Sequence, residues 1–168
     1  LETQEITPVF SDTTLNVPVS MAWLEPGVLA VSDEKADPNG PGMPGTGAIY
    51  RLDLARRELR LLGWSRDWRT PGAICSDLHG GLLLVDRDAT PYDASGGHGS
   101  VFKVTAEGRI AKVSLSRFFA ALRDVQAELD GDPLVVDENS DPYGLGGNPG
   151  AILRWMTGGF VPISSSPM

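Results

Sequence analysis

The chain repeats one short pattern three times at a nearly constant interval. Each copy begins with an aspartate that ends an apolar run, and a proline follows five residues later. These aspartates are Asp33, Asp86 and Asp137, which lie 53 and 51 residues apart. A glycine directly before a second apolar run closes each copy, at Gly47, Gly99 and Gly150. A period near fifty residues is typical of repeat architectures in which each copy folds as one unit.

Each copy contains four short strand candidates separated by turns. In the middle copy these are residues 72–76, 82–85, 100–104 and 109–114. Four antiparallel strands in about fifty residues are the pattern of one β-propeller blade. We therefore predict an all-β chain, a β-propeller with three four-stranded blades, in which blade 1 covers residues 18–67, blade 2 covers 68–116 and blade 3 covers 117–168.

Two segments depart from the regular pattern. Residues 1–17 precede the first blade, and within them Glu5–Phe10 resembles an outer strand that has lost its blade. We expect this segment to act as a clasp between subunits. Residues 116–123 place Phe118, Phe119 and Leu122 on one helical side after a capping Ser116, which predicts a short helix leading into blade 3.

Charge is concentrated in the three polar loops that follow the aspartates. The chain has a net charge of −8, and residues 33–47, 86–99 and 137–150 hold nine acidic and two basic residues. A strongly acidic chain is not expected to bind nucleic acid, for which a basic stripe is the footprint. No apolar run is long enough for a membrane helix. We expect a soluble protein and leave open whether it is secreted or periplasmic.

The repeated aspartates are the best candidates for a metal site. Equivalent second-to-third-strand loops lie on one face of a propeller, so their carboxylates converge, and hard oxygen ligands favour Ca²⁺. Asp33, Asp86, Asp137 and Glu138 are the predicted ligands. A structural interpretation stays open beside this one, because an aspartate at a strand end often accepts backbone N–H groups and shapes the turn.

Three further residues are candidates for ligand binding. His98 and Asn139 lie in the acidic loops of blades 2 and 3, and Trp68 lies in a connection between blades. A solvated histidine and a core tryptophan are the plainer interpretations. The single cysteine, Cys75, sits in an apolar stretch, which indicates a buried and inert thiol.

The pattern in each copy is similar to that of the NHL-type and gluconolactonase-like (senescence marker protein-like) propellers. The segment 134–155, LVVDENSDPYGLGGNPGAILRW, carries the resemblance most clearly, with an apolar strand that ends in Asp, a glycine-rich loop and a G-x-I-x-R strand. The resemblance covers about residues 18–165. It implies a ring of six blades, and for the lactonases a divalent ion in the central channel. Thr70-Pro71-Gly72 matches a position where those enzymes carry a metal ligand, and it lacks one.

Three blades alone leave two apolar sheet faces without neighbours. Two copies related by a two-fold axis would close a six-bladed ring, so a homodimer is the main expectation, and half of a longer protein is the alternative. No complete catalytic set is visible in the sequence. We therefore favour a non-enzymatic scaffold whose acidic loop face binds a ligand, a cation or a partner, including a small molecule or a peptide. The alternative is a metal-dependent lactonase or esterase with its site at the central channel.

Overall fold

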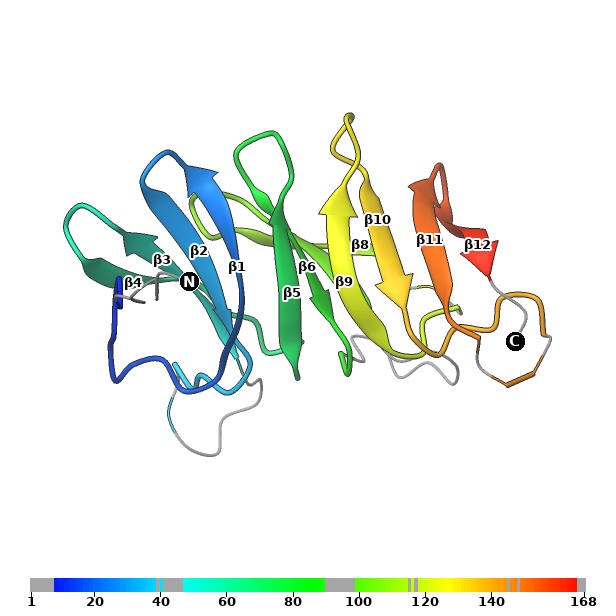
Figure 1. Cartoon of the computed structure of the whole chain (residues 1–168), viewed down its shortest axis with the longest axis horizontal. Helices are drawn as coiled ribbons and strands as arrows, with labels where there is room; N and C mark the ends of the chain where they lie inside the picture. The colour runs from blue at the N-terminus through cyan, green and yellow to red at the C-terminus, as the bar shows by residue number, and fades with distance from the viewer. Residues whose placement is uncertain are drawn as a thin grey trace, which may run out of the picture.

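Three four-stranded antiparallel sheets make up the described part of the protein, each formed by consecutive strands (Figure 1). The structure is a computed structural model, and it describes residues 8–38, 40, 47–89, 99–114, 116, 118–144, 146–147 and 149–165. Within these residues the chain is all-β, and no helix is present. The predicted propeller blades are therefore confirmed as units of the fold.

The strands follow one another in chain order within each sheet. Blade 1 contains β1 (Pro18–Glu25), β2 (Val28–Asp33), β3 (Ala48–Asp53) and β4 (Glu58–Gly63). Blade 2 contains β5 (Pro71–Ser76), β6 (Leu82–Asp86), β7 (Ser100–Val104) and β8 (Ile110–Ser114). Blade 3 contains β9 (Leu122–Ala127), β10 (Pro133–Asp137), β11 (Ala151–Met156) and β12 (Gly159–Ser165).

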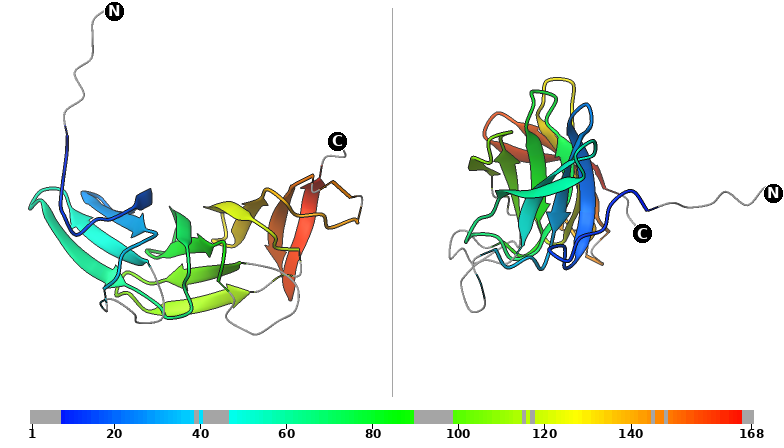
Figure 2. Two further views of the ribbon diagram at one scale, coloured as in Figure 1. Left: turned by 90° about the horizontal axis from the view of Figure 1, so that it is seen from below. Right: turned by 90° about the vertical axis from the view of Figure 1, so that its left-hand side faces the viewer.

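The blades are arranged side by side as a crescent. Figure 2 shows β1, β5 and β9 along its concave side, with β4 and β8 on the convex side. The first strands of neighbouring blades touch, since β1 contacts β5 and β5 contacts β9. The concave side therefore has the place that the central channel has in a closed ring of blades.

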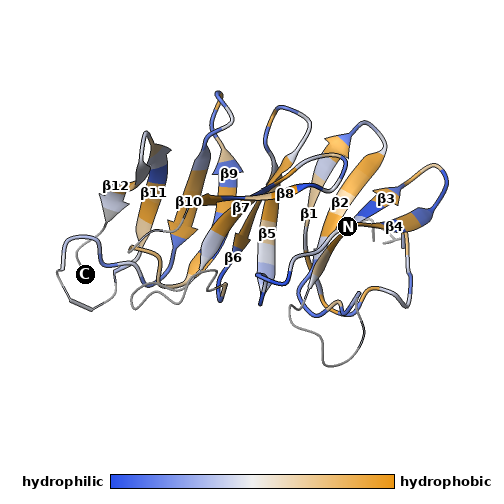
Figure 3. Cartoon of the chain, turned by 180° about the vertical axis from the view of Figure 1, so that it is seen from behind, coloured by the Kyte–Doolittle hydropathy of each residue, from blue (hydrophilic) through white to orange (hydrophobic). Residues whose placement is uncertain are grey.

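The middle blade is buried on both of its faces. Successive side chains of a strand point to opposite faces, so Leu82 and Leu84 of β6 enter the core shared with blade 1, whereas Leu83 and Val85 enter the core shared with blade 3. All four are at most 1% exposed. This double burial explains why β6 has an uninterrupted apolar sequence, and Figure 3 shows the hydrophobic residues concentrated in the strands.

The short helix predicted over residues 116–123 is wrong. The described residues there form one turn, in which the Phe119 N–H donates to the Ser116 carbonyl at 3.1 Å, and β9 then begins at Leu122. Phe119 is only 1% exposed, and the Ala121 N–H donates to the carboxylate of Asp137 instead of to a helical carbonyl. Contacts with blade 3 thus override the local helical pattern.

The predicted outer strand at the N-terminus lies largely outside the described residues. Its described part, residues 8–10, is not in a strand. Among the residues placed by the structure, no helix is long and apolar enough to cross a membrane.

Candidate functional site

The second strand of every blade ends on the same side of the molecule. In Figure 1, β2, β6 and β10 all run toward the lower edge, where they end at Asp33, Asp86 and Asp137. We call this side the loop face, because the connections from β2 to β3, from β6 to β7 and from β10 to β11 leave from it. The predicted common placement of the three aspartates is therefore present.

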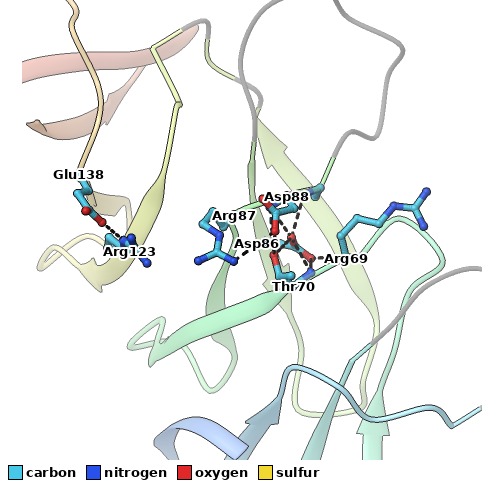
Figure 4. A network of polar contacts seen from close by, with 8 residues as sticks. Arg69, Thr70, Asp86, Arg87, Asp88, Arg123 and Glu138 are labelled. Carbon is cyan, nitrogen blue, oxygen red and sulfur yellow. Dashed lines mark hydrogen bonds and ion pairs between the residues drawn. The ribbon is translucent and has the colours of Figure 1, made fainter. Parts of the chain in front are cut away.

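Asp86 shows what these aspartates do. Its carboxylate is fully buried and accepts the N–H of Arg69 at 2.7 Å, of Thr70 at 3.1 Å and of Asp88 at 3.0 Å (Figure 4). The Ala89 N–H donates to it as well, at 2.9 Å. Burial raises the pKa of Asp86, and these four N–H donors oppose that rise. The carboxylate thus ties the start of the blade's first strand to the end of its second.

The same three contacts recur in the other blades. Asp33 and Asp137 are also fully buried, and each accepts N–H groups from the residues 17 and 16 positions before it and two positions after it. The two preceding donors always come directly before the first strand of the blade. The repeat therefore preserves a hydrogen-bonded clip, which agrees with the turn-shaping interpretation of these aspartates.

This clip limits what a metal ion could use at the same position. To bind Ca²⁺ at the predicted site, the carboxylate oxygens of these aspartates would have to give up their hydrogen bonds from backbone N–H groups. Among the residues that the structure describes, no three His, Cys, Asp or Glu side chains lie close enough together to hold a metal ion. Calcium binding stays a prediction.

A polar pocket lies where the three blades meet on the concave side. It has a volume of about 380 Å³, and every blade contributes to its wall. Blade 1 supplies Ser20 and Glu34, blade 2 supplies Arg87, and blade 3 supplies Arg123 and Asp124. Since Glu34 and Arg87 follow the clip aspartates directly, the clip holds the backbone that carries these charged groups.

Two arginines contribute positive charges to the wall of this pocket. Arg123 forms an ion pair with Glu138, and Arg87 lies 3.4 Å from Asp88 (Figure 4). Both guanidinium groups are about half exposed, so they are open to a ligand in solution. Glu34 and Asp124 add carboxylates to the same wall, and the site therefore offers both donors and acceptors.

The other residues predicted to bind a ligand lie in different environments. Asn139 is exposed, and its backbone N–H completes the clip at Asp137. Trp68 is fully buried, with its ring edge-on to Phe102, so it presents no ring face to a ligand in solution. His98 lies outside the described residues.

Sequence reasoning missed the residues that line the pocket. Glu34 and Arg87 of the pocket wall occupy one repeat position, directly after the aspartate. Glu138, at the same position in blade 3, is a predicted metal ligand, and it pairs with Arg123 of the wall. This shared place is readable in the sequence, but Glu34 is acidic and Arg87 is basic, so the position carries no common chemical signature. Arg123 was assigned to a helix, where its position in β9 beside the pocket could not be recognised.

Together these features define a protein built of β-propeller blades with a polar pocket on the concave side of the crescent. No protein-family model matches the chain, and no curated protein sequence matches it either. Among solved structures it is similar to a chain in the crystal structure of a nidogen/laminin complex, with a TM-score of 0.61 and 13% identity. It is also similar to PpgL, the periplasmic gluconolactonase of Pseudomonas aeruginosa, with a TM-score of 0.52 and 18% identity.

The similarity covers nearly all of this chain and less than half of the other chains. The matches extend over 88% of the present chain in both cases, and over 48% and 45% of the two solved chains. The chain thus spans about half the length of the structures it matches. At these identities the comparisons establish the fold, which agrees with the resemblance to NHL-type and gluconolactonase-like propellers.

Proposed function

We propose that the protein is a non-enzymatic binding module, one half of a propeller ring that a second copy completes. The observation that carries this proposal is the polar pocket of about 380 Å³ to which all three blades contribute. A site built from three repeats at the ring axis suits recognition of a small ligand or of a partner's side chain. The similarity to a propeller solved in a nidogen/laminin complex supports partner binding by this fold.

The charges of the wall indicate the chemistry of the ligand. Guanidinium groups bind carboxylates with charge-assisted hydrogen bonds, so Arg87 and Arg123 suit an acidic group. Glu34 and Asp124 accept hydrogen bonds from hydroxyl groups, and the hydroxyl of Ser20 lies on the same wall. A small carboxylate that also carries hydroxyl groups fits this combination.

Binding of D-gluconate, a hydroxylated carboxylate, tests the proposal. We expect calorimetric titration to detect binding to the wild-type protein, and Arg123→Ala to weaken it roughly tenfold to a hundredfold through loss of a charge-assisted contact. Arg60→Ala is the matched control, because Arg60 is exposed on β4, is absent from the pocket wall and pairs with Glu58. Equal binding by all three proteins, or no binding by any, would contradict the proposed site.

A metal-dependent lactonase is the second candidate function. It is favoured by the similarity to a periplasmic gluconolactonase and by the three aspartates gathered on one face. Hydrolysis of glucono-δ-lactone should be followed with added Ca²⁺ and again with EDTA. The binding-module proposal expects the rate of buffer alone under both conditions, whereas turnover that EDTA abolishes would favour the enzyme.

A further inference from the structure

Each blade has two different faces. The forward face meets the next blade along the chain, and the rear face meets the preceding one. Inside the chain, this forward-to-rear contact occurs twice, between blades 1 and 2 and between blades 2 and 3. Within the part of the chain that the structure describes, the rear face of blade 1 and the forward face of blade 3 have no neighbouring blade, and they lie at the two ends of the crescent in Figure 2.

The open rear face of blade 1 has the residues of a contact between blades. Met21 pairs with Val31 in the same register in which Ile74 pairs with Leu84 and Val125 with Val135. The three first-strand residues are thus equivalent, yet Ile74 and Val125 are 5% and 1% exposed, whereas Met21 is 69% exposed.

The outer part of that rear face is already covered. Leu15 lies three residues before β1, as Trp68 lies three residues before β5 and Phe119 three residues before β9. Like them, Leu15 packs on its blade, where it contacts the cluster that contains Tyr50. The segment before β1 therefore packs as the segments between blades do, and the uncovered part is the inner one, around Met21 and the 55% exposed Trp23.

The open forward face of blade 3 also has apolar residues at the positions that form a contact between blades in blade 2. Val136 pairs with Ile152 as Val85 pairs with Val101. Val85 and Val101 are at most 1% exposed between blades 2 and 3, whereas Val136 is 42% exposed and Ile152 is partly exposed. Apolar residues at the positions of a contact between blades remain open to solvent at this end as well.

We propose that the rear face of blade 1 packs against the forward face of blade 3 of a second copy, in the same contact that joins the blades within one chain. This inference rests on the proposed ring closure and specifies its geometry. The occupant is a second copy because each copy carries both halves of the contact. Two copies about a two-fold axis bury all four open faces at once, whereas a single such contact without closure would continue into a filament.

One polar contact fixes the register of this interface. Between blades 1 and 2, the N–H of Ile74 donates to the hydroxyl of Ser20 at 3.2 Å. Asp124 pairs with Val136 as Ser20 pairs with Ser32, so Asp124 is the equivalent of Ser20 in blade 3. In the closed ring the N–H of Met21 therefore donates to the carboxylate of Asp124 from the other copy.

A disulfide cross-link tests this register. The variant that combines Met21→Cys with Asp124→Cys should form covalent dimers under mild oxidation, visible without reductant as a band at twice the 17.9 kDa of one chain. Both side chains are exposed in the single chain, so the variant is expected to fold. The native Cys75 needs no replacement, since burial raises the pKa of its thiol to about 11 and leaves it unreactive.

The matched control combines Asp124→Cys with Leu129→Cys. Leu129 is 99% exposed at the tip of the β9–β10 hairpin, away from both open faces, and this pair should give no specific covalent dimer. A dimeric mass in solution without the Met21–Asp124 cross-link would overturn the proposed pairing of faces. A monomeric mass at micromolar concentration would overturn the second copy as occupant. Either result leaves D-gluconate binding at the pocket as a separate question, which the Arg123 variant answers.

Discussion

Three buried polar atoms have no hydrogen-bond partner among the described residues: the Trp68 indole nitrogen and the hydroxyls of Ser100 and Ser140. Each lies at a repeat position where the other two blades have an apolar residue. Ser100 corresponds to Ala48 and Ala151, and Ser140 corresponds to Ala36 and Ala89. The fold therefore needs only a small side chain at the two serine positions, and each serine hydroxyl adds a desolvation cost.

Replacement of Ser140 by alanine should stabilise the protein. The variant removes an unpaired buried hydroxyl and keeps a side chain that two other blades already use, so we expect the free energy of unfolding to rise by about 1 kcal/mol. Urea denaturation measures the difference, with Ser164→Ala at an exposed position as the control. A lower stability of Ser140→Ala would show that the hydroxyl has a partner outside the described residues.

The clip aspartates should matter to stability far more than exposed ones. Asp137→Ala leaves the N–H groups of Ala120, Ala121 and Asn139 without their acceptor, and we expect a loss of roughly 2–4 kcal/mol in the free energy of unfolding. Urea denaturation again provides the measurement, and Asp67→Asn, at an exposed position, provides the control. A change below 0.5 kcal/mol would mean that water replaces the carboxylate without cost.

The sequence indicated which residues repeat, and the structure shows why. The aspartates were found because their spacing is visible in one dimension. The residues whose N–H groups bind these aspartates could not be identified from the sequence, because a backbone N–H group belongs to nearly every residue type. The pocket arginines could not be predicted as a pair, because Arg87 and Arg123 come from different repeat positions. Only the packing of blade 2 against blade 3 places both on one wall.

At the scale of the blade, an ion pair crosses the second strand near the end opposite the clip. Arg51 pairs with Glu25 in blade 1, Lys103 with Asp77 in blade 2, and Arg154 with Glu128 in blade 3. In each blade the base is on the third strand and the acid lies at or just after the end of the first. Only Asp77 is fully buried among the acids, so the pair in blade 2 should contribute most.

The pair in blade 2 predicts how stability depends on pH. Burial opposes ionisation of Asp77, but the bond from Lys103 at 2.7 Å and two backbone N–H donors outweigh it and lower its pKa below 3.8. A lowered folded-state pKa gives stability that is complete above 3.8 and is lost as the pH falls through the folded value.

We expect Asp77→Asn to be less stable than the wild type at neutral pH and to lose less on acidification. Urea midpoints at a series of pH values between 7 and 2 measure this, with Asp67→Asn as the exposed control. The difference between wild type and Asp77→Asn should shrink as the pH falls below 3.8. A difference that stays constant over the whole series would exclude ionisation of Asp77 as its source.

Strand positions were predictable wherever apolar runs and turns alternated, which is the case in all three blades. The failure at residues 116–123 has a definite cause. Phe119 occupies the repeat position of Trp68, three residues before the first strand of its blade, and packs edge-on to Phe160 at 4.9 Å. A helical spacing of aromatic residues thus came from a turn that buries the Phe119 ring between blades. Periodicity alone does not distinguish such a turn from a short helix.

For the whole molecule, closure of the ring by a second copy predicts that thermal stability depends on protein concentration. Dissociation accompanies unfolding of a closed dimer, so the Tm of the wild type should rise with concentration in calorimetry. Met21→Glu places a charge on the open rear face and should abolish this dependence. Leu129→Glu, at an exposed hairpin tip, should behave like the wild type. A wild-type Tm that is the same at all concentrations would argue against the dimer.

The double burial of the middle blade also sets an order of events in denaturation. A terminal blade can unfold by breaking its single contact with a neighbouring blade, whereas blade 2 has contacts with two blades and must lose both. Amide protons of β6 should therefore exchange with solvent deuterium last, at the rate set by global opening, and those of the end blades earlier through partial opening. The crescent would then behave as a short one-dimensional stack that frays from its tips, and joining the tips of two copies would remove the fraying ends altogether.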